Sequence, residues 1–184
     1  RLAFSPDGKW LATGSHDRTA RVWDMDTGEQ VGPALHHETA VFSVAFTGAG
    51  ATLATGTGQG LRAWDILTGT ARPLSEAHQR WVIAIAMDSA GSTMATGAVS
   101  GGLLRDPSSG ARSGPALPHG LSVWDIAFDR SGHLVATASE DRKGWLWDRA
   151  SGFLVGPPMV HESAVMSTEF LPDGRTIVTS SRDG

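Results

Sequence analysis

Residues 119–148 read HGLSVWDIAFDRSGHLVATASEDRKGWLWD, and the pattern of this stretch decides the fold. Apolar and polar residues alternate in three short runs, which predicts β-strands with one buried face. The runs are separated by segments rich in Asp, Ser and Gly, the residues that form tight turns. The stretch therefore predicts short antiparallel strands, and nothing in the chain predicts a helix longer than one turn.

The same pattern recurs about every 41 residues along the 184-residue chain. The apolar residues Phe4, Phe46, Met87, Phe128 and Phe170 follow one another at steps of 42, 41, 41 and 42. A histidine and a Trp-Asp pair keep the same period, and Arg-Asp occupies one of the four pair positions. The histidines are His37, His78, His119 and His161, and the pairs begin at Trp23, Trp64, Arg105 and Trp147. Four short strands per repeat are typical of a β-propeller blade.

We therefore predict an all-β chain built from four-stranded antiparallel blades. The expected blades span residues 1–36, 37–77, 78–118 and 119–160, with a half blade at 161–184. About four and a half blades are too few for a closed ring of seven or eight, which needs about 290 residues at this period. We expect an open arc. It is either a piece of a longer chain or a unit that completes a ring by self-association through its open blade faces.

The periodic His, Thr, Asp and Trp-Asp residues resemble the WD-repeat β-propeller family over essentially the whole chain. The glycine that usually precedes the family's histidine is absent from each repeat. The resemblance implies a hydrogen-bonded chain in each blade, formed by the His, the Thr of the second strand, the Asp of the next turn and the Trp of the third strand. The complete set is His119, Thr137, Asp141 and Trp147, and the partial sets are Thr13, Asp17 and Trp23; His37, Thr55 and Trp64; His78 and Thr96; and His161, Thr179 and Asp183. We accordingly expect blade 4 to be the most ordered and blade 3 the least.

Composition excludes several classes of function. The chain has no cysteine, which rules out disulfides, zinc–thiolate sites and thiol nucleophiles. A net charge of −4 argues against nucleic-acid binding, and no apolar run is long enough to cross a membrane. The repeated histidines lie on different blades, and adjacent strand residues such as His36 and His37 point to opposite faces. We expect no metal, no cofactor and no enzymatic activity.

The resemblance also implies a rim of partner-contacting residues three and five positions after each His and directly before the turn Asp. These positions hold Trp81, Phe42, Ile83, Trp124, Met166, His16, Glu140 and Arg182. Large aromatic residues on a rim are the usual anchors of a protein interface. For Trp81 and Trp124 the sequence leaves two alternatives open, a surface anchor or packing between blades.

Three functions fit these features. The leading one is a cytoplasmic, non-catalytic scaffold that binds a protein partner. The second is the sensor array of a larger bacterial signalling protein, such as a serine/threonine kinase or a signalling ATPase, because the recurring Gly-Pro connections at residues 32–33, 114–115 and 156–157 look like bacterial WD-repeat arrays. The third is a propeller hydrolase or lyase. It would need a cluster of His, Asp or Arg in the central channel, and the sequence offers none outside the repeated positions.

Overall fold

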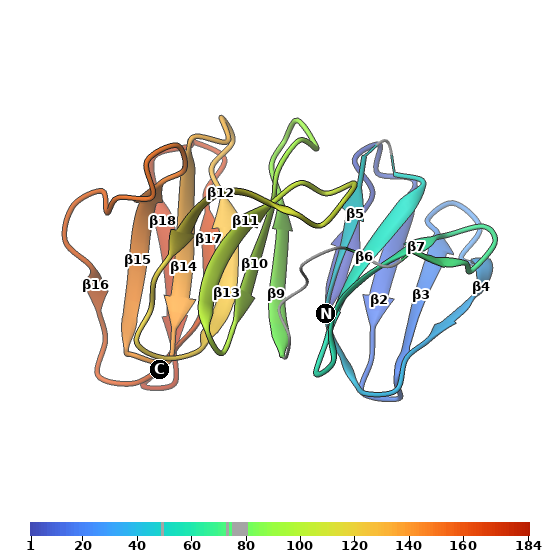
Figure 1. Ribbon diagram of the computed structural model, residues 1–184, viewed down its shortest axis with the longest axis horizontal. Helices are drawn as coiled ribbons and strands as arrows, with labels where there is room; N and C mark the ends of the chain where they lie inside the picture. The colour runs from blue at the N-terminus through green and yellow to red at the C-terminus, as the bar shows by residue number, and fades with distance from the viewer. Residues whose placement is uncertain (49, 73, 75–80) are drawn as a thin grey trace.

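A computed structural model describes residues 1–48, 50–72, 74 and 81–184 (Figure 1). The described residues form five antiparallel sheets, which we call blades 1 to 5 in chain order. Blade 1 holds β1 (Leu2–Phe4), β2 (Trp10–Gly14), β3 (Thr19–Asp24) and β4 (Gln30–His36). Blade 2 holds β5 (Val41–Thr47), β6 (Thr52–Thr57), β7 (Gly60–Asp65) and β8 (Ala71–Arg72). Blade 3 holds β9 (Val82–Met87), β10 (Met94–Ala98), β11 (Gly101–Arg105) and β12 (Arg112–Leu117).

Blade 4 holds β13 (Val123–Phe128), β14 (Leu134–Ser139), β15 (Lys143–Asp148) and β16 (Met159–Val160). Blade 5 holds two strands, β17 (Val165–Phe170) and β18 (Ile177–Ser181). In each blade the strands pair in chain order, so every blade is a meander. Within the described ranges no helix has the length and apolarity that a membrane crossing requires.

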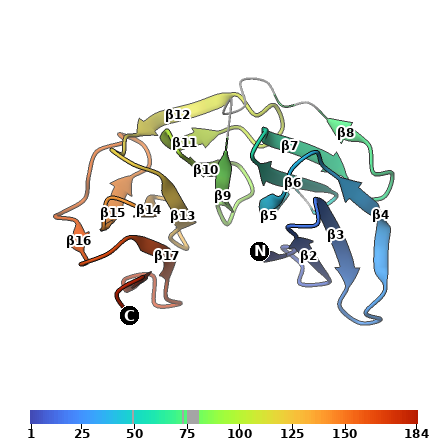
Figure 2. The ribbon, with the colours of Figure 1, turned by 90° about the horizontal axis from the view of Figure 1, so that it is seen from below.

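The blades stand side by side around an arc, in the order of the chain (Figure 2). The first strand of each blade lies nearest the centre and the fourth lies at the periphery. Blades 1 and 5 do not meet, so the arc is open. This architecture confirms the predicted all-β class, with four complete four-stranded blades and one partial blade in the part of the chain that is described.

The turn from the third to the fourth strand explains one of the recurring glycines. Its glycine follows the Asp of the Trp-Asp pair by four residues and donates a backbone hydrogen bond to the carbonyl of that Asp. The turn requires a positive φ at this position, which costs glycine nothing because it has no Cβ. The four glycines are Gly28, Gly69, Gly110 and Gly152, with φ between 67° and 75°.

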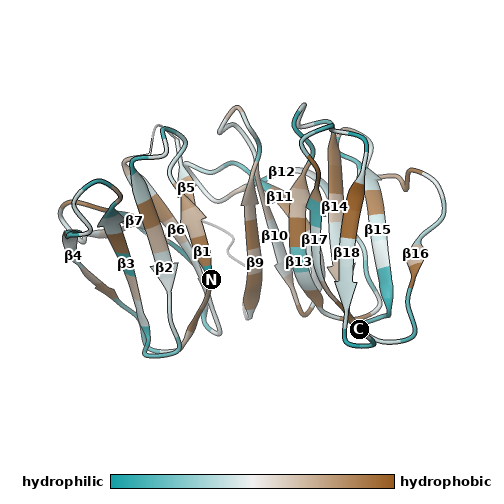
Figure 3. Cartoon of the chain, turned by 180° about the vertical axis from the view of Figure 1, so that it is seen from behind, coloured by the Kyte–Doolittle hydropathy of each residue, from teal (hydrophilic) through white to brown (hydrophobic). Residues whose placement is uncertain are grey.

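Among the described residues the core lies between neighbouring blades, in three clusters made mostly of strand residues. Figure 3 shows apolar residues concentrated along the strands and hydrophilic residues in the turns. The cluster between blades 1 and 2 contains Phe46 and Trp64, and the cluster between blades 3 and 4 contains Trp147. The cluster between blades 2 and 3 has no aromatic member among its described residues, and its largest side chains are Leu61, Leu74 and Met94. The blades are thus held together unequally.

Candidate functional site

Blade 4 contains a continuous hydrogen-bonded chain centred on Thr137. Trp147 Nε1 donates to Thr137 Oγ1 at 2.9 Å, and Thr137 Oγ1 lies 2.8 Å from His119 Nε2. His119 Nδ1 lies 2.8 Å from the carbonyl oxygen of Leu117. A carbonyl oxygen can only accept a hydrogen bond, so Nδ1 of His119 carries the proton. In the neutral ring Nε2 then accepts a hydrogen bond from the Thr137 hydroxyl. Burial lowers the pKa of His119, which favours this neutral form.

Asp141 takes a different partner from the one expected. Its carboxylate accepts the indole N–H of Trp145 at 3.1 Å and the backbone N–H of Lys143 at 3.1 Å. No hydrogen bond joins it to His119, because the Leu117 carbonyl already satisfies the ring Nδ1. Blade 5 is closer to the expected arrangement. There His161 Nε2 lies 2.9 Å from Thr179 Oγ1, and His161 Nδ1 lies 4.0 Å from Asp183 Oδ1.

The central threonines of blades 1 and 2 accept an indole N–H but use their own protons differently. Trp23 donates to Thr13 at 3.1 Å, and Thr13 donates to the carbonyl of Arg21 at 3.5 Å. Asp17 accepts the backbone N–H and the hydroxyl of Thr19, at 2.9 and 2.7 Å. The Thr19 side-chain and backbone hydrogen bonds hold the pKa of Asp17 below its ordinary value. This Asp therefore orders its own turn.

Blade 2 departs from the expected chain at its histidine. Trp64 donates to Thr55 at 3.0 Å, but Thr55 donates to the carbonyl of Arg62 at 3.2 Å. His37 Nε2 is buried and has no hydrogen-bond partner among the described residues. Its ring instead meets Trp64 edge-on at 4.8 Å. Burial, with smaller contributions from Arg62 and His36, lowers the pKa of His37 to about 4. The threonine proton goes to the main chain, so it is not available to this histidine.

Blade 3 keeps its central threonine and replaces the indole donor with a guanidinium. Arg105 Nε donates to Thr96 Oγ1 at 3.3 Å, and Arg105 Nη1 donates to the carbonyl of Gly110 at 2.6 Å. Arg105 is only 2% exposed and is the largest fully buried side chain in the described part of the chain. His78, expected in this set, lies outside the described residues. The repeat pattern places Arg105 at a tryptophan position, and only the structure reveals that it supplies the same hydrogen bond.

The residues five positions after each repeated histidine share a backbone feature that the sequence did not reveal. Each is the extra residue of a β-bulge between the first and second strands of its blade, where it has no partner in the ladder. A bulge turns a side chain out of the regular alternation and is common beside functional sites. The bulged residues are Phe42, Ile83, Trp124 and Met166.

Three rim residues from consecutive blades form one aromatic row. The Phe42 and Trp81 rings are stacked, with centroids 5.5 Å apart and an interplanar angle of 23°. His16 meets Phe42 edge-on at 5.9 Å. Trp81 is 48% exposed, and its φ of 54° lies in the left-handed region, where aromatic residues are rare. The row formed by His16, Phe42 and Trp81 is therefore a preformed and partly strained surface.

The remaining rim residues do not join this row. Glu140 and Arg182 are exposed, Met166 is half-buried and Ile83 is buried. Trp124 is half-buried and its indole N–H is buried without a hydrogen-bond partner among the described residues. The backbone carbonyl of Trp124 accepts a hydrogen bond from Nη2 of Arg1 at 3.2 Å. The structure thus brings Trp81 together with Phe42 and places Trp124 apart from both.

The described residues contain no group of three or more His, Asp or Glu side chains arranged to hold a metal ion. The titratable groups discussed above act within single blades, on threonine hydroxyls, indoles and turn amides. Their geometry supports the blades and leaves the aromatic row as the feature suited to contact with another molecule.

An open arc of four-stranded blades with Trp–Thr hydrogen bonds at a common position defines a WD-repeat propeller. The family model described as "WD domain, G-beta repeat" matches residues 1–24, 29–65, 116–148 and 158–184. These segments cover well over half of the chain, so the protein belongs to this family. The unmatched residues 66–115 include Arg105, where the tryptophan is replaced. Domains of this family commonly mediate protein interactions and are typically not catalytic.

Curated relatives match the chain over short segments of 30 to 60 residues. The general transcriptional corepressor TUP1 of Saccharomyces cerevisiae is 42% identical over 45 residues, which are 24% of this chain and 6% of that protein. The ribosome biogenesis protein ERB1 of Debaryomyces hansenii is 60% identical over 30 residues, 16% of this chain and 4% of that protein. The WD repeat-containing protein SL1-17 of Schistosoma mansoni is 37% identical over 60 residues, 33% of this chain and 20% of that protein. The matched segments span a fifth or less of these eukaryotic relatives.

Proposed function

We propose that this protein is a non-catalytic scaffold of the cytoplasm that binds a protein partner through the row of His16, Phe42 and Trp81. The observation that carries the proposal is the stacked pair of Phe42 and Trp81, which presents a half-exposed indole across two blades. Membership of the WD-repeat family supports it, since such domains commonly bind proteins.

The energetics of the row favour a binding role for Trp81. A left-handed backbone costs an aromatic residue about 1–3 kcal/mol, and such strain tends to occur at functional sites. Stacking on Phe42 fixes the ring before a partner arrives, so less side-chain entropy is lost on binding. Tryptophan is also the residue most enriched among interface hot spots.

A selection of displayed peptides against the purified chain tests this proposal. Peptides that bind the wild type should bind Trp81→Ala more weakly by about 2 kcal/mol or more in titration calorimetry. Phe153→Ala is the matched control, because Phe153 is 76% exposed on the outer side of blade 4, away from the row. Equal loss of affinity in both variants, or selected peptides insensitive to Trp81, would refute the assignment of the row.

Self-association through the open blade faces is a second proposal, supported by the exposure of blade 1. Leu2 and Phe4 are 68% and 64% exposed, whereas Val44 and Phe46, at the same repeat positions in blade 2, are each 5% exposed. The face that buries blade 2 against blade 1 is therefore uncovered on blade 1. Sedimentation velocity should give oligomers that Phe4→Asp disperses, while a concentration-independent monomer would exclude this mode.

A regulatory array within a larger bacterial signalling protein, such as a serine/threonine kinase or a signalling ATPase, is the remaining proposal. Its support is the recurring Gly-Pro pair, which begins at Gly32 in β4, at Gly114 in β12 and at Gly156 before β16. We also propose blade limits at 36/37, 77/78, 118/119 and 160/161. A kinase or ATPase motif in the same open reading frame would favour this role over a free-standing scaffold.

A further inference from the structure

Clefts separate neighbouring blades at the end of each blade that carries the first-to-second and third-to-fourth turns. One residue position decides how each cleft is filled. This position directly follows the Asp of the Trp-Asp or Arg-Asp pair, in the turn leading to the fourth strand. It points toward the preceding blade. The residue is Ile66 in blade 2, Pro107 in blade 3 and Arg149 in blade 4. We call it the cleft-facing residue.

The cleft between blades 1 and 2 is filled by an apolar contact. Ile66 is 1% exposed and belongs to the core cluster against which Trp10 and Val31 of blade 1 pack. Gly32 of blade 1 lies so close to the Ile66 carbonyl that a Cβ at this glycine would clash with it. The remaining cavity, beside Trp10, has a volume of about 240 Å³.

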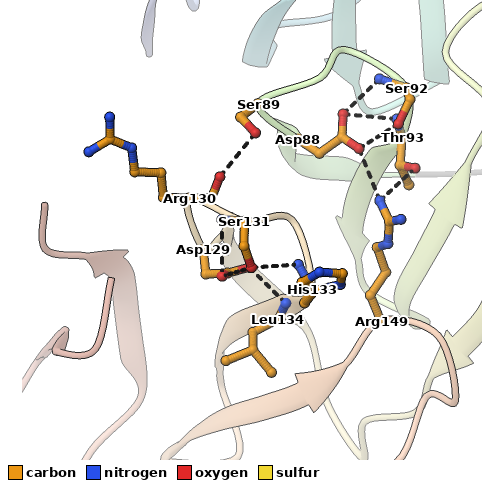
Figure 4. A network of polar contacts seen from close by, with 10 residues as sticks. All are labelled: Asp88, Ser89, Ser92, Thr93, Asp129, Arg130, Ser131, His133, Leu134 and Arg149. Carbon is orange, nitrogen blue, oxygen red and sulfur yellow. Dashed lines mark hydrogen bonds and ion pairs between the residues drawn. The ribbon is translucent and has the colours of Figure 1, made fainter. Parts of the chain in front are cut away.

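The cleft between blades 3 and 4 is filled by an ion pair (Figure 4). Arg149 Nη1 donates to Asp88 Oδ2 at 3.0 Å and to Thr93 Oγ1 at 3.1 Å. Asp88 is 5% exposed, so the charge of Arg149 compensates a buried carboxylate. The cavity that remains measures about 190 Å³. In both clefts the chemistry of the cleft-facing residue therefore matches that of the blade it touches.

Among the described residues, the cleft between blades 2 and 3 has no such filling. Pro107 is too short to cross it, and the adjacent core cluster lacks the aromatic side chains that occupy the other two interfaces. A cavity of about 450 Å³ remains, roughly twice the volume of either neighbour. Blade 2 lines it with Thr47, Thr52 and Arg72, and blade 3 lines it with Ser92, Asp106 and Pro107.

The blade 2 wall of this cleft carries a positive charge, whereas the blade 3 wall that binds Arg149 carries a negative one. Thr47 and Thr52 stand at the repeat positions of Asp88 and Thr93, so the acid is replaced by a hydroxyl. Arg72 adds an exposed guanidinium from β8, opposite Ala63 of β7. Among the described residues neither Arg72 nor the Thr52 hydroxyl makes a hydrogen bond or an ion pair. The Arg72 charge acts only as a minor contribution to the low pKa of Asp65, after the Thr68 hydrogen bonds.

Asp106 on the blade 3 wall is held by hydrogen bonds within its own turn. Its Oδ1 accepts the backbone N–H and the hydroxyl of Ser108 and of Ser109, at 2.6 to 3.1 Å. These hydrogen bonds, the Ser108 hydroxyl first, lower the pKa of Asp106 to about 2. Its charge is thus stabilised inside its own turn. Arg72 is the cation of the cleft whose hydrogen-bonding capacity is unused.

We propose that the cleft between blades 2 and 3 binds a carboxylate carried on a short flexible arm, with Arg72 and Thr52 as its donors. An arginine pairs with a carboxylate through two parallel hydrogen bonds, and a hydroxyl adds a third. The site is independent of the aromatic row. The first-to-second and third-to-fourth turns, which form the cleft, lie at one end of each antiparallel blade. His16 lies in a turn between second and third strands, which is at the opposite end.

Two probes distinguish the possible sources of such a carboxylate, a free dicarboxylic acid and an acidic side chain of a protein. The probes are glutarate and the blocked tripeptide acetyl-Gly-Glu-Gly-amide, each titrated into the ¹⁵N-labelled full chain. We expect saturable shifts of the amides of Gly48, Thr52 and Gly91, with a dissociation constant on the order of 1 mM. Tighter binding of the peptide assigns the site to acidic side chains, and tighter binding of glutarate assigns it to free acids.

Three variants distinguish binding in the cleft from nonspecific attraction between the acidic probes and positive charges. Arg72→Gln should weaken binding by at least about tenfold. Arg112→Gln, which removes the same charge from the outer strand of blade 3 outside the cleft, should leave it unchanged. Pro107→Ile, which restores the residue type of blade 2, should abolish binding with Arg72 still present. Heteronuclear spectra that retain the wild-type dispersion verify that each variant is folded.

The proposal is overturned if the corresponding Gln tripeptide gives the same shifts as the Glu tripeptide. It is equally overturned if Arg112→Gln weakens binding as much as Arg72→Gln, or if Pro107→Ile binds as the wild type does. Because the test uses residues at the opposite end of the blades, its failure leaves the proposed role of Trp81 untouched.

Discussion

Blades 3 and 4 use different side chains to donate a hydrogen bond to the threonine of the second strand. In blade 4 an indole N–H reaches Thr137 at 2.9 Å, and in blade 3 a guanidinium N–H reaches Thr96 at 3.3 Å. Both threonines are fully buried. The comparison teaches that the position requires a long side chain with an N–H donor that reaches across to the second strand. An aromatic ring is not the requirement.

Trp147 and Arg105 contribute differently to the packing between neighbouring blades. Trp147 is a large apolar ring in the core cluster between blades 3 and 4. Arg105 satisfies polar groups, including the carbonyl of Gly110, but it contributes a charge to the interior. A buried charge is tolerated only while its hydrogen bonds hold. Blade 3 is therefore polar where blade 4 is apolar, and the interface between blades 2 and 3 is less well filled.

The largest expected effect comes from removing the blade 4 ring. Trp147→Ala should lower the free energy of unfolding by about 3–5 kcal/mol, because it leaves a cavity and removes the indole N–H that Thr137 Oγ1 accepts. Urea denaturation followed by circular dichroism measures the loss. Phe153→Ala, at a 76% exposed ring, should change the same quantity by less than about 0.5 kcal/mol. Similar losses in the two variants would contradict the core role of Trp147.

Substitution of Arg105 tests whether the donor or the ring matters in blade 3. Arg105→Ala should cost about 3 kcal/mol, since Thr96 and the Gly110 carbonyl lose a charged donor in a buried place. Arg105→Trp, which restores the residue type of the other blades, should cost less than half as much. A tryptophan variant that unfolds as readily as the alanine variant would show that blade 3 is adapted to arginine.

The pH dependence of stability should identify the half-buried His37. Its pKa is about 4 in the folded chain and about 6.5 when unfolded. Between these values the unfolded state binds more protons, so stability falls as the pH falls through this window and the contribution becomes constant below about pH 4. His37→Gln should flatten the change in urea midpoint between about pH 7 and pH 5. His16→Gln, at an exposed ring, is the substitution control.

Hydrogen exchange ranks the two blades directly. Amides of β14 in blade 4 should exchange more slowly than amides of β10 in blade 3, because local opening is easier where fewer apolar contacts are lost. Mass spectrometry of peptides covering Leu134–Ser139 and Met94–Ala98 measures both in one sample. Equal or greater protection of β10 would mean that Arg105 stabilises its blade as well as Trp147 does.

The smallest effect on stability is expected at the rim. Trp81→Asn should change the free energy of unfolding by less than about 1 kcal/mol, because asparagine tolerates a positive φ and this relief offsets the lost stacking on Phe42. Partner peptides should nevertheless no longer bind the variant. A loss of stability comparable to that of Trp147→Ala would place Trp81 in the core and end its role as an anchor.

Much of the fold follows from local sequence patterns. Alternating residues such as those of β13 and β14, separated by turns with Asp and Gly, specify short antiparallel strands without reference to distant residues. The 41-residue period then specifies how many blades exist. The positions of the central threonines Thr13, Thr55 and Thr137 follow from that period, because each holds a fixed place in its strand.

The partners of the site residues were harder to predict. Asp141 pairs with Trp145 and His119 with the Leu117 carbonyl, and these pairings follow from how the strands of the blade place the groups in space. The bulges at Phe42 and Trp124 depend on how two strands pair, which a single-strand pattern does not record. A sequence signal did exist for Arg105, which stands in the period of the tryptophans.

The sequence by itself determined the blades, their order and the open arc, because strand and turn preferences are local and the repeat is long and regular. Only the tertiary structure decided which hydroxyl, ring or carbonyl each polar group binds, and which cleft stays open. Those outcomes depend on residues of adjacent blades, such as Pro107 facing Thr52 and Arg149 facing Asp88, whose complementarity appears only when the blades are packed side by side.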